Sequence, residues 1–371
     1  MLKKLLFAAV GVIVATAISY LVAEGVYSLS HGGQAETSLG YALLSRHLWV
    51  QKPGALDARD ASSRVIVDRS QIEKLLDTMK ANGVGLGNSP FDVLKTDEAA
   101  INVEKDGCLW QKPNLRKVMS YLRSNLMNPF DQMTYFYDAG RTLPPELQGF
   151  FERYGFHEVH FTTNENGERV TLPPVESRDK VLVAGDSVAN GVMLDDTETL
   201  SSQLQAHDPA RQYVNLGVSR AHAPDIVCNL ERAAERYQRQ VREVVYVFCE
   251  NDFAPDEPYG RPEQLVTWLA QFRRRWTLER ITLLYVPYIY NAAPEVTRVR
   301  GHSHFTFPTY ADEKRRLLDL AAKEGFRVVD FLEIAEEQSR AVGSQFAPLA
   351  LYVDHTHFSR LGVEKVLPRL R

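Results

Sequence analysis

The second half of the chain alternates short apolar runs with amphipathic stretches of helical length. The apolar runs are rich in β-branched residues and predict strands over 181–185, 212–216, 243–249, 280–286 and 326–330. Helices are predicted from Ser187, and over 199–206, 224–239, 262–276, 309–324, 331–341 and 359–370. Strands that alternate with helices form a parallel sheet with right-handed crossovers and helices on both faces. The sequence therefore predicts an α/β domain over 178–371.

The first of these strands ends on Gly185-Asp186-Ser187. Gly185 permits a tight turn, and Ser187 then stands at the carboxyl end of the strand, where open α/β sheets bind their ligands. A serine in that position, at the start of a helix, is well placed to act as a nucleophile. The alternative is a serine that only caps the helix. The tripeptide alone does not decide between the two.

Other segments end on polar residues at the same edge of the predicted sheet. These segments are Asn215-Leu216-Gly217 after the second strand, Asn251-Asp252 after the third, and Asp354-His355-Thr356-His357 before the last helix. Because the carboxyl ends of parallel strands share one edge, we expect all of them to converge with Ser187 on one cleft. This convergence predicts an active site there.

The roles follow from the chemistry of acyl transfer. A serine hydroxyl needs a base, and His357 is the candidate, with Asp354 as the acceptor that orients its imidazole. A spacing of three returns Asp354 and His357 to one side of the chain, whereas the adjacent His355 is expected to point elsewhere. The oxyanion needs donors, which we expect from the backbone N–H groups of Ser187 and Gly217 and the side-chain amide of Asn251.

In these four blocks, and in their order, the chain resembles the SGNH hydrolases, the GDSL-type esterases, over about residues 178–371. The resemblance implies a flavodoxin-like three-layer α/β/α sandwich and the hydrolysis of an ester or the transfer of an acyl group. It implies Ser187 as nucleophile, Asp354 and His357 as its partners, and Ser187, Gly217 and Asn251 as the oxyanion hole. The chain departs from the family pattern at Val188, where the namesake motif has Leu, and at Cys249, where the third block has Gly.

The N-terminus predicts a membrane anchor. Lys3 and Lys4 precede an uncharged, mostly apolar run over 5–23, which at about 1.5 Å per residue is long enough to cross a bilayer. We predict a signal anchor over 1–27, with the N-terminus in the cytoplasm and the rest of the chain outside, in the periplasm if the source is Gram-negative. A cleaved signal peptide is the alternative.

Residues 28–177 read as a linker and an accessory segment ahead of the catalytic domain. They predict one short helix near 41–48, a helix opened by the capping box of Ser70 and Glu73, and another over 113–126. Alternating aromatic and polar residues over 133–172 predict short strands and hairpins that pack onto the later sheet. An added segment of this kind resembles that of membrane-anchored bacterial members of the family, including polysaccharide O-acetyl-transfer proteins.

Composition excludes several classes of partner and cofactor. The net charge of −4 gives no reason to expect nucleic acid. The three cysteines are odd in number and far apart, so we expect no disulfide framework and no zinc site, with Cys228 and Cys249 as buried apolar residues. His157 and His160 lack a third metal ligand nearby. We therefore expect no metal and no cofactor.

Several alternatives remain open at this point. The same triad serves a hydrolase or an acyltransferase, and the ester substrate is a small molecule or a glycan. The basic loop over 291–308 is either a substrate contact or a solvated surface. An inactive binding domain and a flavin-binding protein are the other readings, although Gly-Asp-Ser-Val-Ala-Asn is a poor phosphate loop. The sequence does not predict an oligomeric state.

Overall fold

The computed structural model describes residues 101–121, 134–140, 157–293, 310–345 and 347–371, and scattered positions over 142–148. It also describes the backbone of three short strands, β1 (Leu48–Gln51), β2 (Val65–Asp68) and β3 (Gly85–Asn88). The predicted signal anchor, the helix that opens at Ser70 and most of the loop over 291–308 lie outside the described residues. So does the predicted helix near 41–48, except for Leu48, which is a strand residue.

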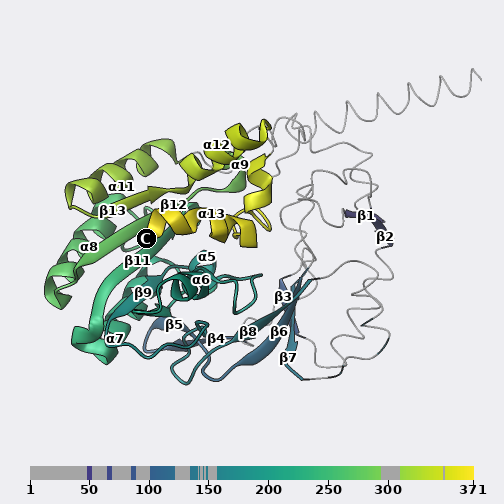
Figure 1. Ribbon diagram of the computed structural model, residues 1–371, viewed down its shortest axis with the longest axis horizontal. Helices are drawn as coiled ribbons and strands as arrows, with labels where there is room; N and C mark the ends of the chain where they lie inside the picture. The colour runs from purple at the N-terminus through teal and green to yellow at the C-terminus, as the bar shows by residue number, and fades with distance from the viewer. Residues whose placement is uncertain are drawn as a thin grey trace, which may run out of the picture.

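A parallel five-stranded sheet forms the centre of the described structure (Figure 1). Its strands are β9 (Lys180–Ala184), β10 (Gln212–Asn215), β11 (Val241–Cys249), β12 (Arg280–Val286) and β13 (Arg327–Asp330). Their order in space is β10-β9-β11-β12-β13, and every neighbouring pair is parallel. This is the flavodoxin-like order, in which the first and second strands exchange places. The strand predictions over 181–330 are confirmed.

Helices cover both faces of this sheet, because side chains along each strand alternate between two cores. One core joins Leu182, Tyr246 and Leu283 to three helices, which are α7 (Ala223–Tyr237), α8 (Pro262–Trp276) and α11 (Ala311–Lys323). The other core joins Val183 and Val247 to α5 (Ser187–Asn190), α6 (Leu200–His207), α9 (Ile289–Ala292), α12 (Phe331–Val342) and α13 (Arg360–Leu370). The predicted three-layer arrangement is therefore present.

The accessory segment contributes a four-stranded antiparallel sheet, in the order β3-β7-β6-β8, and a β4–β5 hairpin. The bounds are β4 (Asn102–Lys105), β5 (Cys108–Gln111), β6 (Arg116–Tyr121), β7 (Thr134–Asp138) and β8 (His157–Thr162). β7 and β8 confirm the strands expected over 133–172. The helix predicted over 113–126 is wrong over β6. There Met119 and Tyr121 are buried at a period of two, and pairing with β7 and β8 overrides the helical spacing.

The expectation of no disulfide is also wrong. Cys108 in β5 and Cys228 in α7 form a disulfide with a Cα–Cα distance of 6.3 Å. The two cysteines are 120 residues apart in the sequence, and the fold brings them together by laying β5 against α7. Cys249 is free and fully buried, as expected. The disulfide fastens the accessory hairpin to a helix of the α/β domain.

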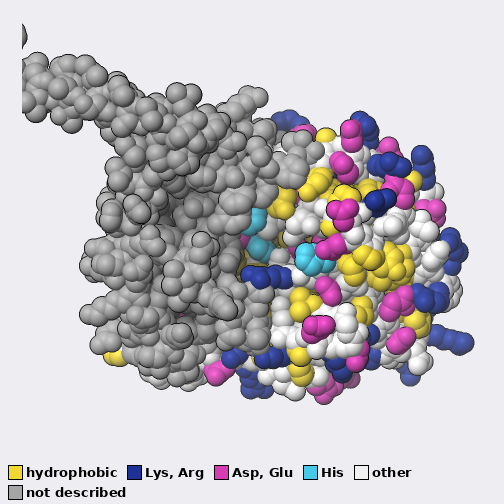
Figure 2. Space-filling view, turned by 180° about the vertical axis from the view of Figure 1, so that it is seen from behind, with side chains coloured by type: hydrophobic (Ala, Val, Ile, Leu, Met, Phe, Trp, Pro, Cys, Tyr) yellow, Lys and Arg dark blue, Asp and Glu magenta, His cyan; other side chains and the backbone are white. Residues whose placement is uncertain are grey.

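The surface of the described part is mixed in charge. On the face seen in Figure 2, basic and acidic side chains are interspersed, and histidine side chains appear near its middle. Among the described residues, no helix is both long and apolar enough to cross a membrane.

Candidate active site

The turn after β9 presents Ser187 at the carboxyl edge of the sheet. Gly185 is required there, because a Cβ would lie 2.5 Å from the carbonyl oxygen of Val247. Asp186 caps the short helix α5 by accepting a hydrogen bond from the backbone N–H of Val188 at 2.8 Å. Its other carboxylate oxygen lies 3.5 Å from Ser187 Oγ. Ser187 itself is buried except for 9% of its surface.

The segment before α13 joins Asp354 to His357. The two side chains contact through Nδ1 and Oδ2 at 2.5 Å, and the other oxygen of Asp354 accepts the backbone N–H groups of Thr356 and His357, each at 2.7 Å. Asp354 is fully buried. The adjacent His355 lies 4.0 Å from Asp354 and stacks on Tyr288, with ring centroids 5.9 Å apart. The carboxylate is therefore held for His357 and not for His355.

The electrostatics of this pair suit a base. Burial lowers the pKa of His357, but the charge and hydrogen bond of Asp354 and the charge of Asp186 outweigh it and raise the pKa above 6.5. Burial raises the pKa of Asp354, but His357 and then His355 lower it well below its ordinary value. His357 Nε2 is buried and has no hydrogen-bond partner among the described residues. The influence of Asp186 shows that the turn bearing Ser187 lies within electrostatic reach of His357.

Asn251 lies beside this turn. It sits in a short 3-10 turn (Glu250–Asp252) after β11, and its Nδ2 donates to Asp186 at 2.9 Å. The preceding Cys249 has an ordinary extended backbone, with φ −96° and ψ 154°, so the glycine of the family pattern is not needed there. Its thiol instead lies 2.8 Å from the hydroxyl of Thr356 and links β11 to the segment of His357.

Gly217 does not present a free donor. Its N–H donates to the side-chain oxygen of Asn215 at 3.0 Å, and its carbonyl accepts from Asn190 Nδ2 at 2.8 Å. A Cβ at Gly217 would lie 2.1 Å from the backbone nitrogen of Asn190. The structure thus uses Gly217 to pack the turn after β10 against the helix of Ser187.

Two carboxylates took no role in the sequence analysis although both stand in the motifs. Burial raises the pKa of Asp186 above its ordinary value, although the hydrogen bonds from Asn251 and Val188 act to lower it. Asp252 is buried behind it, and burial together with the charge of Asp186 raises its pKa well above the ordinary value.

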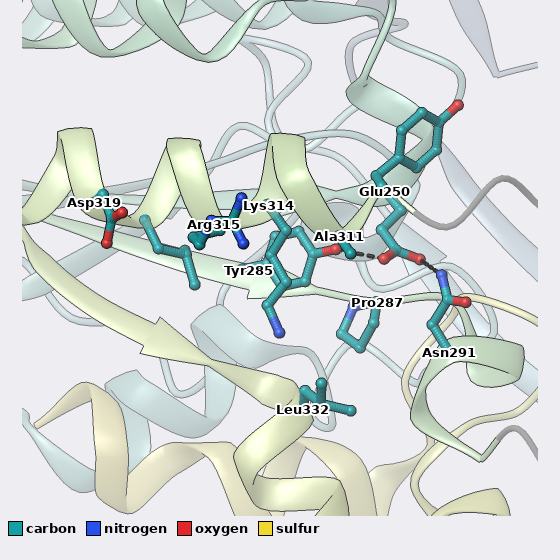
Figure 3. Close-up of a pocket in the computed structure, with 11 residues that line it drawn as sticks. Glu250, Tyr285, Pro287, Asn291, Ala311, Lys314, Arg315, Asp319 and Leu332 are labelled. Atoms are coloured by element: carbon teal, nitrogen blue, oxygen red, sulfur yellow. Dashed lines mark hydrogen bonds between the residues drawn. The ribbon is translucent and has the colours of Figure 1, made fainter.

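Glu250 is another polar residue that the sequence analysis missed. It borders a cavity of about 500 Å³ between α11 and the ends of β12 and β13 (Figure 3). Its carboxylate accepts hydrogen bonds from the hydroxyl of Tyr285, the N–H of Tyr288 at 2.7 Å and Asn291 Nδ2 at 2.6 Å. Ile289, which follows Tyr288 in the chain, donates its N–H to the carbonyl of His355 at 2.8 Å. Glu250 therefore braces the loop against which the histidine segment rests.

The described residues contain no cluster of three or more His, Cys, Asp or Glu side chains that could hold a metal ion. His160 contacts Asp195 instead, with its Nδ1 2.9 Å from the carboxylate.

Comparisons with known proteins give similar structures but no sequence family. No family model matches the chain, and no curated protein matches it. Among solved structures, it is similar to a member of the lipolytic G-D-S-L family from Veillonella parvula, with 13% identity, a TM-score of 0.38, and coverage of 52% of this chain and 96% of the other. An acetylxylan esterase mutant from Geobacillus stearothermophilus has 17% identity and a TM-score of 0.38, covering 53% and 94%. The acetyl xylan esterase AlAXEase has 14% identity and a TM-score of 0.39, covering 52% and 97%.

Proposed function

We propose that this protein is a serine esterase of the SGNH type, with Ser187 as nucleophile, His357 as base and Asp354 as its orienting carboxylate. One observation carries the proposal. Asp354 contacts Nδ1 of His357 and accepts the backbone N–H groups of Thr356 and His357. Nε2 of His357 has no partner among the described residues and lies at the sheet edge where Ser187 stands. This division of the two ring nitrogens is what a general base for a serine hydroxyl requires.

The proposed reaction has two stages. Ser187 Oγ attacks the carbonyl carbon of the ester while His357 Nε2 takes its proton, and the imidazolium then gives that proton to the departing alcohol. Water or another hydroxyl next attacks the carbonyl carbon of the acyl-serine and loses its proton to His357. The imidazolium returns this proton to Ser187 Oγ as the bond between the acyl carbon and Oγ breaks, and the acid or the new ester leaves. Asp354 and the more distant Asp186 both favour the cationic form of His357 that the first step creates.

The donors for the oxyanion follow from the site. The backbone N–H of Ser187 lies at the start of α5. The side-chain amide of Asn251 has two N–H groups, and one of them donates a hydrogen bond to Asp186, which leaves the other for the oxyanion. We propose these two as oxyanion donors. Gly217 would first have to release the side chain of Asn215, which speaks against it as a donor in this conformation.

We also propose that the enzyme acts outside the cytoplasm, attached to the membrane through residues 1–27. The disulfide between Cys108 and Cys228 supports an oxidising compartment, because structural disulfides are rare in the cytosol. A reporter fused after Arg371 should be active only outside the cytoplasm, and the full-length protein should sediment with membranes. Release of a shortened soluble form would show that the N-terminal segment is cleaved.

The substrate class can be tested directly. The full-length protein in detergent should hydrolyse p-nitrophenyl acetate, and the assay is repeated with added glycan acceptors. Release of acetate in both assays supports the hydrolase, whereas an acetylated glycan would assign the transferase that shares the triad. A folded protein that does neither would contradict the proposal.

A further inference from the structure

We propose that Arg169, which lies before the α/β domain, is a positioning residue for the nucleophile. This inference rests on the proposed serine-esterase function. Arg169 belongs to the accessory segment. Arginine side chains are mostly exposed to solvent in folded proteins. The side chain of Arg169 is instead completely buried and lies over the ring of Phe161, 4.6 Å from the ring centroid. Its Nε pairs with the buried carboxylate of Asp196 at 3.2 Å, and the rest of the guanidinium must find other acceptors.

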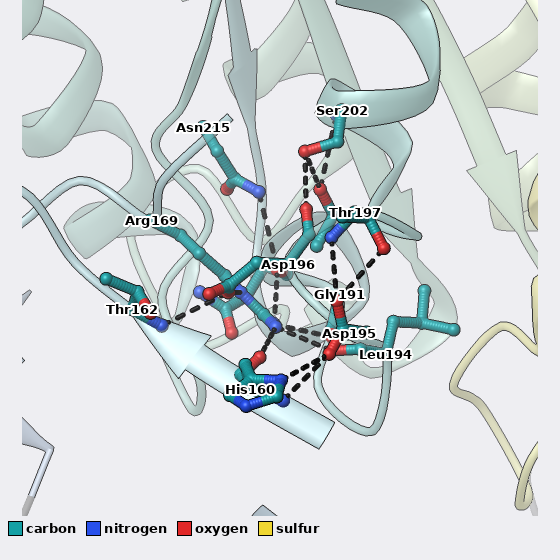
Figure 4. A network of polar contacts seen from close by, with 12 residues as sticks. His160, Thr162, Arg169, Gly191, Leu194, Asp195, Asp196, Thr197, Ser202 and Asn215 are labelled. Atoms are coloured by element: carbon teal, nitrogen blue, oxygen red, sulfur yellow. Dashed lines mark hydrogen bonds and ion pairs between the residues drawn. The ribbon is translucent and has the colours of Figure 1, made fainter. Parts of the chain in front are cut away.

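All five N–H groups of Arg169 are used, and most of them hold the loop after the nucleophile helix (Figure 4). Nη1 donates to the carbonyls of Asn190 and Gly191 at 3.1 and 2.6 Å, and Nη2 donates to that of Leu194 at 2.6 Å. The remaining bonds reach the carbonyl of His160 and the carboxylate of Asp196.

This loop is bonded directly to the nucleophile. The carbonyl of Ser187 accepts the N–H groups of Gly191 and Val192 at 3.0 and 3.2 Å. Arg169 therefore stands two hydrogen bonds from Ser187, through Gly191. The loop also contains Met193 at φ +67°, a conformation that side-chain-bearing residues rarely adopt. Such a backbone persists where its surroundings fix it, and the guanidinium supplies that fixation.

The edge of the accessory sheet holds the same loop from its other side. The N–H groups of His160 and Thr162 in β8 donate to the carboxylates of Asp195 and Asp196 at 3.0 and 3.1 Å. The exposed edge of this sheet is thereby closed by the loop of the catalytic domain. The segment expected to pack onto the central sheet also reaches that sheet at its edge, where Arg169 forms an antiparallel bridge with Asn215 of β10.

The accessory sheet also contacts the second catalytic segment. Met119 and Val159 share one buried apolar cluster with Val192 and Met193 after the nucleophile, and with Val353, the residue before Asp354. One rigid sheet thus packs on the chain that follows Ser187 and on the chain that precedes the histidine pair. Arg169 fixes the polar half of this contact, so we infer that it sets where Ser187 lies relative to His357.

The test compares Arg169→Met and Arg169→Lys with the wild-type full-length protein. The expected result for Arg169→Met is a fall in kcat of about 10- to 100-fold with KM little changed, because small displacements of a nucleophile cost rate and not affinity. The rate of labelling of Ser187 by a fluorophosphonate should fall in the same proportion. Arg169→Lys, which keeps the charge but not the five-donor geometry, should recover part of both rates.

Arg211→Met is the matched control, because Arg211 is likewise held by carboxylates, those of Asp208 and Glu243, but lies where β10 and β11 begin. It should leave kcat and labelling unchanged. Should Arg169→Met fail to fold, Arg169→Lys and the milder Asp196→Asn carry the test. Folded variants with a lower Tm but wild-type kcat and labelling would overturn the inference, and would show a purely structural arginine. If the wild-type protein itself is not labelled, the proposed function fails and this inference fails with it, whereas a labelled wild type with unaffected Arg169 variants overturns the inference alone.

Discussion

The histidine segment and the turns that follow β10 and β11 lie at one edge of the sheet but are held in different ways. Asp354 binds His357 and Thr356 within a span of four residues, so this segment organises itself. Asn251 instead depends on Asp186, 65 residues earlier, and Gly217 depends on Asn190, 27 residues earlier. The base is therefore positioned by contacts within one short segment, whereas the residues on the oxyanion side are positioned by contacts between distant parts of the chain.

The largest effect is expected at the base, His357. His357→Ala should lower kcat by about 10⁴-fold or more, as Ser187→Ala should, because members of a triad act as one unit. His355→Ala is the matched control and should stay within about tenfold of wild type, since Asp354 is committed to His357. Steady-state kinetics on the folded variants decides the matter. Loss of activity in His355→Ala with activity kept in His357→Ala would reverse the assignment.

Asn251→Ala tests the oxyanion side of the site. Removing one oxyanion donor typically lowers kcat by about 10²–10³-fold. The Tm should change little, because Asn251 is exposed and lies beyond the end of β11. A change in kcat of less than about tenfold would remove Asn251 from the oxyanion hole and weaken the comparison.

Gly217→Ala, unlike Asn251→Ala, should lower the stability of the protein. The new methyl group would collide with the backbone of Asn190, so we expect the free energy of unfolding to fall by about 1–3 kcal/mol. Denaturant titration measures this loss, and Asn251→Ala serves as the comparison variant. A Gly217→Ala protein as stable as the wild type would show that this turn is not packed against the nucleophile helix as described.

The pH dependence probes the contact between the two sides. His357 must be neutral to act as the base, so kcat/KM should fall as the pH drops through its pKa, with a midpoint above 6.5. Asp186→Asn removes one of the charges that raise this pKa, so the midpoint should move to lower pH. A midpoint that stays in place or moves upward would show that Asp186 does not act on His357.

The same contrast explains what the sequence could predict. The strands from β9 to β13 and the pairing of Asp354 with His357 depend on residues close together in the chain, and the local patterns indicate them. The error over 113–126 arose because Val118 and Met119 fit a helical face as well as a strand, and only the pairing of β6 with β7 and β8 decides between them. Short-range periodicity carries no information on such partners.

Most of the contacts that the sequence analysis missed span long distances in the chain. Cys108 and Cys228 are 120 residues apart, and their pairing requires the docking of β5 on α7. Arg169 resembles a solvated surface residue until the fold places Asn190, Gly191 and Leu194 around it. The engagement of Gly217 by Asn215 is local, but the close approach of Asn190 that requires the glycine is not.

Covalent labelling tests the central claim most directly. The full-length protein is treated with a fluorophosphonate, digested and mapped by mass spectrometry, with Ser187→Ala treated in parallel. The proposed mechanism predicts one adduct, on Ser187, formed faster as the pH rises through the pKa of His357 and absent from the alanine variant. A folded protein that is not labelled, or an adduct on another residue that forms equally in Ser187→Ala, would contradict it.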